Sequence, residues 1–246
     1  MNKNRYMVIS CEILFREVCL CAAKCRNIVD LKFIEKGLHD IGAAKMSEEL
    51  QNEIDQVDPA RYDAILLCYG LCNNGIVGLH SPLPIVIPRA HDCITLMMGS
   101  KEKYRQYFNA NPGTYFKSSG WLERDADPCA AEGSTISQLG IGKPYDEYVE
   151  LYGEENAEFL ASVLGDMTAH YRKAAYINDG AGNIDSDRTA TREFAESKGW
   201  EYEETEGGTG LIRKLFDGDW DEREFLVVLP DKRITPSNDD GVIKYE

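Results

Sequence analysis

Residues 63–79, DAILLCYGLCNNGIVGL, place a short apolar run directly before a turn rich in glycine and asparagine. An apolar run of this length, without alternating polar positions, is typical of a strand that is buried on both faces of a parallel sheet. We therefore expect a strand over residues 63–68, followed by a loop that carries Cys72.

Similar apolar segments on both sides of this strand supply the rest of the sheet. We expect these further strands over residues 5–10, 28–34 and 84–87. Segments 12–26 and 43–57 have apolar residues at helical spacing, and another helix is expected to begin near Asp92. The alternation of strands and helices predicts an α/β fold with a doubly wound, mostly parallel, Rossmann-like sheet and helices on both faces.

The second half of the chain has the same character. We expect strands over residues 174–178, 200–204 and 225–229, and helices over residues 144–170, 187–198 and 208–217. Residues 109–135 are rich in Gly, Pro, Asn and Ser and predict a long loop, and the polar tail after Pro230 is expected to be loose. These patterns indicate one α/β domain over residues 1–246, with possible βαβ halves at 1–108 and 136–230 joined by the long loop.

The charge of the chain excludes some classes of partner. Asp and Glu number 42 against 27 Lys and Arg, which gives a net charge of -15. A nucleic-acid-binding protein normally presents a basic surface to the phosphates, so we expect no nucleic-acid partner and no anionic membrane surface. Charged residues interrupt the N-terminal apolar run, so we expect no signal peptide and a cytoplasmic location.

Cysteine and histidine side chains follow three of the predicted strands. Cys11 ends the first strand, Cys72 follows the strand at 63–68, and His91 and Cys93 form an H-x-C pair after the strand at 84–87. The carboxyl ends of parallel strands meet at one edge of the sheet, where α/β proteins bind ligands. Thiolate and imidazole are the ligands that zinc prefers, and a set of three cysteines could equally hold an iron–sulfur cluster. His39, in the turn after residues 28–34, is a reserve ligand.

The other cysteines are expected to serve as core packing. A free cysteine often behaves as a small hydrophobic residue, and we expect this of Cys19, Cys21, Cys25, Cys68 and Cys129. No C-x2-C pair is present, which argues against a zinc ribbon and a thioredoxin-type motif. The position of Cys93 near a helix start predicts a lowered thiol pKa.

A few residues near these cysteines are candidates for contact with a ligand. Asp92 either caps the helix or orients a metal-bound imidazole, and Arg89 either binds an anionic group or forms a surface ion pair. In the segment GTYFKSSGW, Gly113, Tyr115 and Trp121 could close over a ligand, or the aromatic rings could fix the loop to the core. The glycine-rich turns match neither G-x-G-x-x-G nor a Walker A loop.

Several motifs resemble those of the domain-of-unknown-function family DUF1638. These motifs are SCEILFREV, GLHD, YGLCNNGIVGL, PRAHDCITLMMGS, GTYFKSSGW and LFDGDWDEREFLVVLP. The positions that match are Cys11, His39, Cys72, His91, Asp92 and Cys93, whereas Cys68 falls at a position expected to vary. The resemblance implies an anaerobic host and an association with corrinoid-dependent methyltransferase systems, but no assigned activity.

These observations favour a metal-binding protein of anaerobic one-carbon metabolism. Zinc is the preferred metal, and methyl or thiol transfer at the Cys/His site is the expected reaction, because zinc-dependent thiol methyltransferases of corrinoid systems also use an H-x-C pair with a distant cysteine. The alternatives are a non-catalytic corrinoid-binding or accessory protein, and an iron–sulfur or thiol redox protein. The expected partner is a small molecule or a corrinoid protein, and a homodimer is possible.

Overall fold

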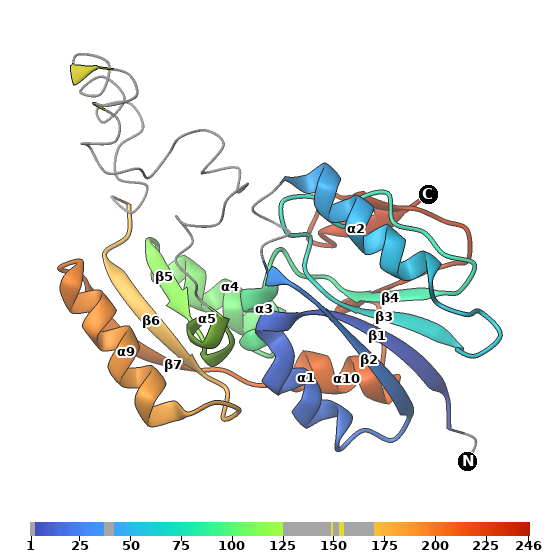
Figure 1. The fold of residues 1–246 in the computed structure, drawn as a ribbon, viewed down its shortest axis with the longest axis horizontal. Coiled ribbons are helices and arrows are strands. Elements are labelled where there is room, and N and C mark those ends of the chain that lie inside the picture. The colour runs from blue at the N-terminus through green and yellow to red at the C-terminus, as the bar shows by residue number, and fades with distance from the viewer. Residues whose placement is uncertain (1–2, 37–41, 125–148, 150–152, 155–169) are drawn as a thin grey trace.

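A computed structural model describes residues 3–36, 42–124, 149, 153–154 and 170–246. Within this part the chain forms two sheets and a terminal hairpin (Figure 1). None of the described helices combines the length and the apolar character needed to cross a membrane.

Sheet A carries the N-terminal half and the last long strand. Its order is β2-β1-β3-β4-β8, with bounds β1 Arg5–Cys11, β2 Ile28–Ile34, β3 Ala64–Cys68, β4 Ile85–Pro88 and β8 Phe225–Val228. The first four strands are parallel, whereas β8 runs antiparallel to β4. Every residue of β3 and β4 is buried, as expected for central strands covered on both faces. The mostly parallel α/β fold predicted from the sequence is confirmed.

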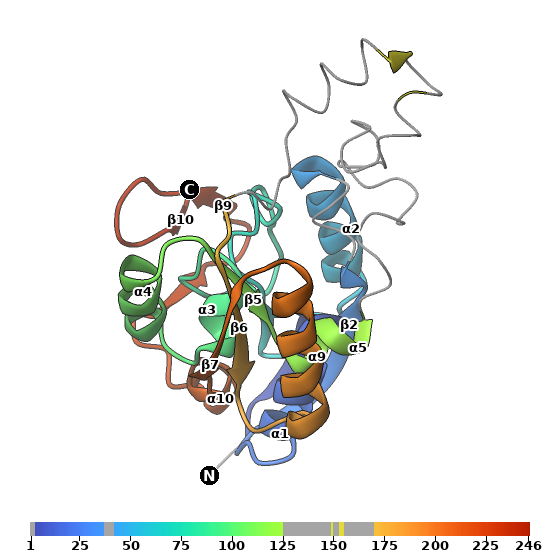
Figure 2. The same ribbon diagram turned by 90° about the vertical axis from the view of Figure 1, so that its left-hand side faces the viewer.

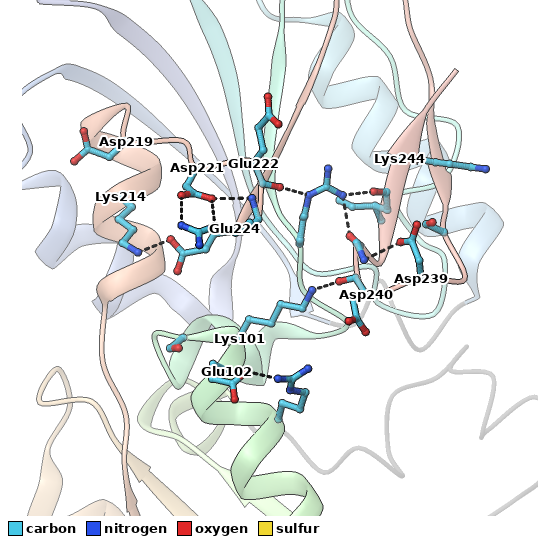
Figure 3. A pocket seen from close by; sticks show the side chains of 17 residues that line it. Lys101, Glu102, Lys214, Asp219, Asp221, Glu222, Glu224, Asp239, Asp240 and Lys244 are labelled. Carbon is cyan, nitrogen blue, oxygen red and sulfur yellow. Dashed lines mark hydrogen bonds and ion pairs between the residues drawn. The ribbon is translucent and has the colours of Figure 1, made fainter.

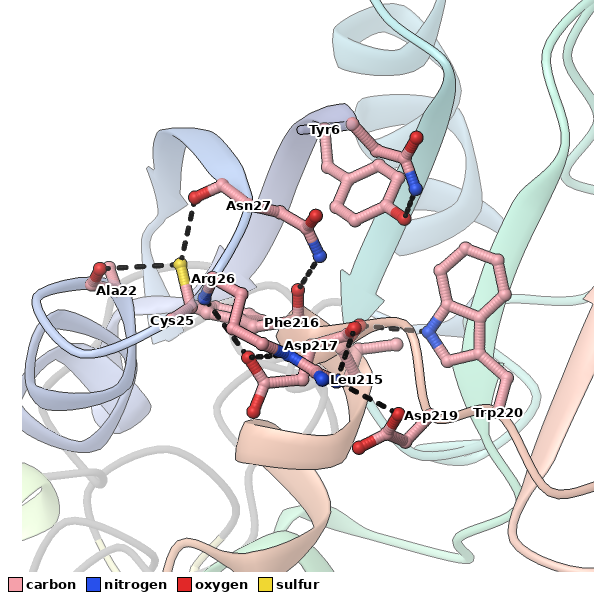
Figure 4. A network of polar contacts seen from close by, with 11 residues as sticks. Tyr6, Ala22, Cys25, Arg26, Asn27, Leu215, Phe216, Asp217, Asp219 and Trp220 are labelled. Atoms are coloured by element: carbon pink, nitrogen blue, oxygen red, sulfur yellow. Dashed lines mark hydrogen bonds and ion pairs between the residues drawn. The ribbon is translucent and has the colours of Figure 1, made fainter. Parts of the chain in front are cut away.

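Helices cover both faces of sheet A (Figure 1). Helix α2 lies on one face, and the short α1 and α10 lie on the other and contact each other. Their bounds are α1 Phe15–Ala22, α2 Ala43–Asp55 and α10 Gly210–Asp217, and a 3-10 turn, η1 Glu12–Leu14, joins β1 to α1. Asn27 donates to the carbonyl of Phe216 over 2.9 Å and so ties the end of α10 to the start of β2 (Figure 4).

Sheet B is a second, smaller parallel sheet of order β5-β6-β7, with β5 Thr114–Lys117, β6 Lys173–Asn178 and β7 Glu201–Glu206. Helix α9 (Ile184–Ser197) packs against β6 and β7. Helix α4 (Lys101–Ala110) lies on the other side of this sheet (Figure 2), where Tyr107 packs on Phe116 with ring centroids 5.5 Å apart.

The chain passes from sheet A to sheet B and back to sheet A. The chain leaves sheet A after the short helix α3 (Cys93–Met97), builds sheet B, and returns through α10 and β8 to sheet A. Residues 225–228 therefore complete the sheet that residues 5–11 begin. The single α/β domain expected over residues 1–246 stays a prediction.

Two segments expected to be irregular contain regular structure. The expected loop over 109–135 includes β5 and α5 (Ser119–Arg124), and its residues from 125 onward lie outside the described part. The tail expected to be loose forms a hairpin of β9 (Ile234–Pro236) and β10 (Ile243–Tyr245). Ile234 and Ile243 are buried, so burial of apolar side chains holds a segment whose overall composition is polar. The helix expected over 144–170 lies almost entirely outside the described residues.

Candidate metal-binding thiol site

Three thiols gather at the carboxyl edge of sheet A. Cys11 is the last residue of β1, Cys72 lies in the loop after β3, and Cys93 is the first residue of α3, beyond the end of β4. The three thiols lie within electrostatic range, since Cys11 raises the pKa of both Cys72 and Cys93, and Cys72 raises that of Cys93. The convergence predicted from the strand ends is therefore present for these three cysteines.

Burial makes all three thiols weak acids. It raises the pKa of Cys11 to about 11 and that of Cys72 to about 12, and it holds the pKa of Cys93 well above its usual value. Backbone hydrogen bonds act in the opposite direction, from Ile13 on Cys11 and from Gly70 and Cys93 on Cys72, but their effect is smaller than that of burial. The lowered pKa predicted for Cys93 is therefore wrong, because desolvation outweighs the potential at the helix start.

The loop that carries Cys72 is docked on the loop that carries His91. The backbone N–H of Leu71 donates to the carbonyl of Ala90 over 2.8 Å, and that of Cys72 donates to the carbonyl of His91 over 2.9 Å. Gly70 permits this close approach, because a Cβ atom there would lie 2.6 Å from the backbone nitrogen of Asp92. The backbone therefore fixes the position of Cys72 relative to Cys93.

The backbone at Cys72 is strained. Cys72, Asn73 and Asn74 have φ values of 43°, 57° and 68°, so three successive residues other than glycine adopt the left-handed conformation. Asparagine tolerates this conformation better than most residues, but cysteine has no such preference. Strain of this kind costs about 1–3 kcal/mol per residue and is concentrated at functional sites.

The three residues that carry the thiols differ in their exposure. Cys11 is 8% exposed, and Cys72 and Cys93 are each partly exposed at the surface of the core. Electrostatic effects of Arg124 and Lys36 lower the pKa of Cys11, and Glu12 raises it. Arg124 also pairs with Glu12 at 3.2 Å, so an ion pair lies close to Cys11.

A tyrosine hydroxyl lies beside the thiols. Tyr69 directly follows β3 and is 3% exposed, and its hydroxyl has no hydrogen-bond partner among the described residues. Burial raises the Tyr69 pKa well above its usual value, and Cys11 and Cys72 raise it further. Sequence reasoning missed Tyr69, although its place between a buried strand and Gly70 in the Y-G-L-C segment was a usable signal.

Of the two histidines predicted as ligands, only His91 lies within the described residues. The side chain of His91 is exposed, and His39 lies outside the described residues. In the described part of the chain, no group of three or more His, Cys, Asp or Glu side chains is arranged to hold a metal ion. Metal binding would therefore require the three thiols to turn toward a common centre.

Asp92 caps helix α3, as one of its two expected roles predicts. Its carboxylate accepts from the backbone N–H of Thr95 over 3.1 Å and from the hydroxyl of Tyr104 over 2.9 Å. These bonds hold the start of α3, and with it Cys93, against α4. Neither of these two hydrogen bonds joins Asp92 to an imidazole.

Arg89 binds backbone carbonyl groups of the C-terminal segments. Its guanidinium donates to the carbonyl oxygens of Glu222, Phe225, Gly241 and Ile243. It lines a charged groove of about 1290 Å³ (Figure 3), whose other charged side chains are partly paired with one another, for example Arg223 with Asp221 at 2.7 Å. The groove is therefore lined by charges of both signs.

The residues expected to close over a ligand lie in sheet B and its surroundings. Gly113 precedes β5 at the edge opposite to its carboxyl end and lies against the carbonyl of His170. Tyr115 belongs to an aromatic cluster with Tyr171, Phe194 and Trp200. Trp121 lies in α5, which packs against η1 directly after Cys11. Of the three, Trp121 is the one whose element borders the thiol site.

The described cysteines outside the site take the roles expected of packing residues. Cys21 and Cys68 are 3% and 0% exposed, and burial raises the pKa of both thiols. The Cys25 thiol donates to the carbonyl oxygens of Ala22 and Asn27 in the turn after α1 (Figure 4). Cys19 is partly exposed, and Cys129 lies outside the described residues.

Comparison with known proteins identifies the family but no activity. No curated protein and no solved structure is significantly similar to this chain. A family model described as "Protein of unknown function (DUF1638)" matches residues 33–216, a range that contains Cys72, His91 and Cys93 and begins after Cys11. Because the match covers well over half of the 246 residues, the chain belongs to the DUF1638 family of proteins of unknown function.

Proposed function

We propose that the protein binds a thiophilic metal ion, preferably zinc, through the thiols of Cys11, Cys72 and Cys93. The observation that carries this proposal is the convergence of three cysteines from the ends of three adjacent strands. Packing alone does not require cysteine side chains at the carboxyl edge of the sheet, which is the edge where α/β proteins bind ligands.

The raised thiol pKa values mean that a cation bound here would have to displace protons from the thiols. Without one, the thiols of Cys11 and Cys72 keep their protons at neutral pH, because their pKa values are about 11 and 12. A neutral thiol is a poor nucleophile and a poor ligand. A bound divalent ion stabilises the thiolates, and the net charge of -15 favours the approach of cations.

Three protein thiolates leave room for one further ligand in a tetrahedral site. Zinc sites of this type act on that ligand, whereas sites with four protein ligands are structural. A substrate thiol at this position would lose its proton at neutral pH, since the positive charge of the ion lowers its pKa. The reaction we propose is attack of that thiolate on an activated methyl group. The S–C bond forms as the bond between the methyl carbon and its carrier breaks, and the carrier keeps the electron pair of that bond. A corrinoid as the carrier stays an expectation from the family resemblance.

Metal content after purification without oxygen tests the proposal. We expect about one zinc per chain in the wild type, and a lower zinc content in Cys93→Ser and Cys72→Ser, because each variant keeps two of the three thiols and binds zinc more weakly. The matched control is Cys19→Ser, which removes a partly exposed thiol that lies in α1, outside the site. Wild-type protein without bound metal, or equal zinc in Cys93→Ser and Cys19→Ser, would contradict the proposal.

A thiol redox function is the second candidate. It is favoured by the electrostatic coupling of Cys72 and Cys93, two partly exposed residues that follow the neighbouring strands β3 and β4. Oxidation would join the two sulfurs and release two protons and two electrons to an oxidant such as glutathione disulfide. This candidate predicts a loss of two titratable thiols in that oxidant, reversed by dithiothreitol, in protein that contains no metal.

A further inference from the structure

Strand β2 forms an open edge of sheet A. It pairs with β1 over all of its 7 residues without a bulge, and no strand in the described part of the chain pairs with its other side. The backbone N–H of Ile28 donates to the carbonyl of Asn4 over 2.9 Å, on the β1 side. Because backbone groups alternate in direction along a strand, those of Val29, Leu31 and Phe33 point away from β1. Such an edge is a template for a further strand.

Apolar side chains at this edge are incompletely covered. Ile28 is 44% exposed, and Phe15, which packs on Phe33 with ring centroids 4.8 Å apart, is 40% exposed. These two belong to the small set of large hydrophobic side chains that are exposed in the described part of the chain. The edge therefore offers apolar contacts as well as backbone hydrogen bonds to a partner.

Two charged side chains interrupt the apolar residues of β2. Asp30 accepts hydrogen bonds from Arg5 and from the hydroxyl of Tyr62, each over 2.8 Å, and Lys32 forms an ion pair with Glu53 of α2 at 3.1 Å. The side chains of Asp30 and Lys32 are still 34% and 49% exposed, and they share one face of the sheet because they are two residues apart. Charges on an edge strand oppose any partner strand that lacks matching charges.

We propose that the partner is a second copy of this chain, which adds its own β2 antiparallel to this edge with a twofold axis at Leu31. The strand sequence IVDLKFI is complementary to itself about this residue. The pairs across the axis are opposite in charge or both apolar: Asp30 with Lys32 of the other copy, Val29 with Phe33, and Ile28 with Ile34. Both kinds of pair stabilise neighbouring strands, and the self-complementary contact closes a dimer in which the two copies of sheet A form one continuous sheet.

Backbone direction and charge together select this register. Only Val29, Leu31 and Phe33 turn their backbone groups outward, so an antiparallel partner has to meet them with its own outward-facing residues. Centred on Leu31, the pairing satisfies this condition at all three positions. An axis at Asp30 or at Lys32 would satisfy it as well, but each would set that residue opposite itself, and like charges directly opposite each other destabilise a strand pair. The dimer contact is independent of the proposed metal site.

Sedimentation velocity of the full chain over a wide range of concentration tests the proposal. The wild type is compared with Lys32→Glu, which sets a carboxylate opposite Asp30 across the axis, and with Leu31→Pro, which removes the outward N–H on the axis. An edge strand tolerates proline where the N–H faces outward, so the monomer should still fold. Lys232→Glu is the matched control, because it makes the same change of charge at an exposed position between β8 and β9. Circular dichroism and urea unfolding check the fold of each variant.

We expect a dimer in the wild type and in Lys232→Glu, a dimer at least about tenfold weaker in Lys32→Glu, and a folded monomer in Leu31→Pro. Hydrogen exchange locates the contact, because the outward amides of β2 gain hydrogen bonds in the dimer. The peptide that covers β2 should therefore exchange more slowly at concentrations at which the wild type and Lys232→Glu are dimeric.

Three results would overturn the inference. The first is a wild type that stays monomeric at every concentration. The second is an equally stable dimer in the wild type and Lys32→Glu, because the two charges would then not face each other. The third is a dimer in which exchange of the β2 peptide does not slow, because the contact would then lie elsewhere. If Leu31→Pro fails to fold, Lys32→Glu and the exchange measurement decide without it.

Discussion

Gly70 decides whether the Cys72 loop can approach Cys93. A side chain at this position would lie 2.6 Å from the backbone nitrogen of Asp92, and the opposing group is backbone that cannot move aside. We expect Gly70→Ala to lower the free energy of unfolding by about 1–3 kcal/mol, as overpacking does, and to weaken zinc binding. Urea unfolding and a chelator competition would measure both effects. Gly208→Ala is the control, because a Cβ atom there meets nothing within 4 Å. Equal stability and equal zinc affinity of the two variants would contradict the role of Gly70 in the close approach of the two loops.

The pKa values of the thiols set the pH dependence of metal binding. The thiols of Cys11 and Cys72 have pKa values of about 11 and 12, and that of Cys93 is also raised, so all three are protonated in the metal-free protein at neutral pH. Each bound thiolate therefore releases one proton, and apparent affinity rises with pH by about tenfold per unit for each proton released. We expect about a 1000-fold rise per pH unit in the wild type and about 100-fold in Cys72→Ser, measured against a chelator. An affinity independent of pH would contradict the ligand set.

At the scale of single residues, the sequence predicts position where a strand end fixes it. Cys11, Cys72 and Cys93 lie at or beyond the ends of parallel strands, which finish at one edge of sheet A. Their role as ligands stays a prediction. The exposure of His91 could not be predicted, because it depends on the side-chain direction in a loop. The pKa of Cys93 was predicted in the wrong direction, since local helix position says nothing about burial by distant segments.

At the scale of elements, the hairpin of β9 and β10 closes the edge of the fold. Ile234, Val242 and Ile243 are buried, and Arg89 donates to the carbonyls of Gly241 and Ile243. Ending the chain at Lys232 would expose the core that these residues cover and leave the Arg89 guanidinium without two acceptors. We expect a loss of at least about 3 kcal/mol in the free energy of unfolding, measured by urea denaturation. Unchanged stability would show that the hairpin does not stabilise the fold.

Sequence reasoning found the elements with strong apolar patterns and missed those stabilised by context. Strands β1, β3, β4 and β6 are largely apolar and β2 alternates between apolar and polar residues, and the bounds of all five agree with the prediction within a residue or two. Helix α4 has no fully buried residue, so its apolar periodicity was too weak to detect. Strand β5 is only four residues long and lies among turn-forming residues, where burial against β6 and α4 decides its structure.

At the scale of the whole molecule, buried carboxyl groups join the two sheets. Glu17 of α1 is fully buried and contacts Asp179 in the turn after β6. Burial first, and then the proximity of Asp179 and the charge of Glu123, together raise the pKa of Glu17 to about 9. The folded protein therefore holds a proton that the unfolded chain, with an ordinary value of 4.5, releases.

The sign of the effect on stability follows from this difference. Stability is greatest below the ordinary value of 4.5 and falls as the pH rises toward 9, by at most about 1.4 kcal/mol per pH unit. Glu17→Gln keeps the shape of the side chain and cannot lose a proton. Its free energy of unfolding in urea should therefore change less between about pH 5.5 and 8.5 than that of the wild type, because these pH values lie roughly between the unfolded and folded pKa values of Glu17. Glu48→Gln, at an exposed position on α2, should behave as the wild type does. Parallel pH profiles for wild type and Glu17→Gln would contradict a proton at this contact.

X-ray absorption at the zinc edge of the zinc-loaded protein tests the central claim most directly, because it counts the sulfur atoms around the metal. The site proposed here predicts three sulfur ligands at about 2.3 Å and one lighter ligand, with two sulfurs remaining in Cys93→Ser. A shell of nitrogen and oxygen alone, or an unchanged sulfur count in Cys93→Ser, would contradict the claim that Cys11, Cys72 and Cys93 form one metal site.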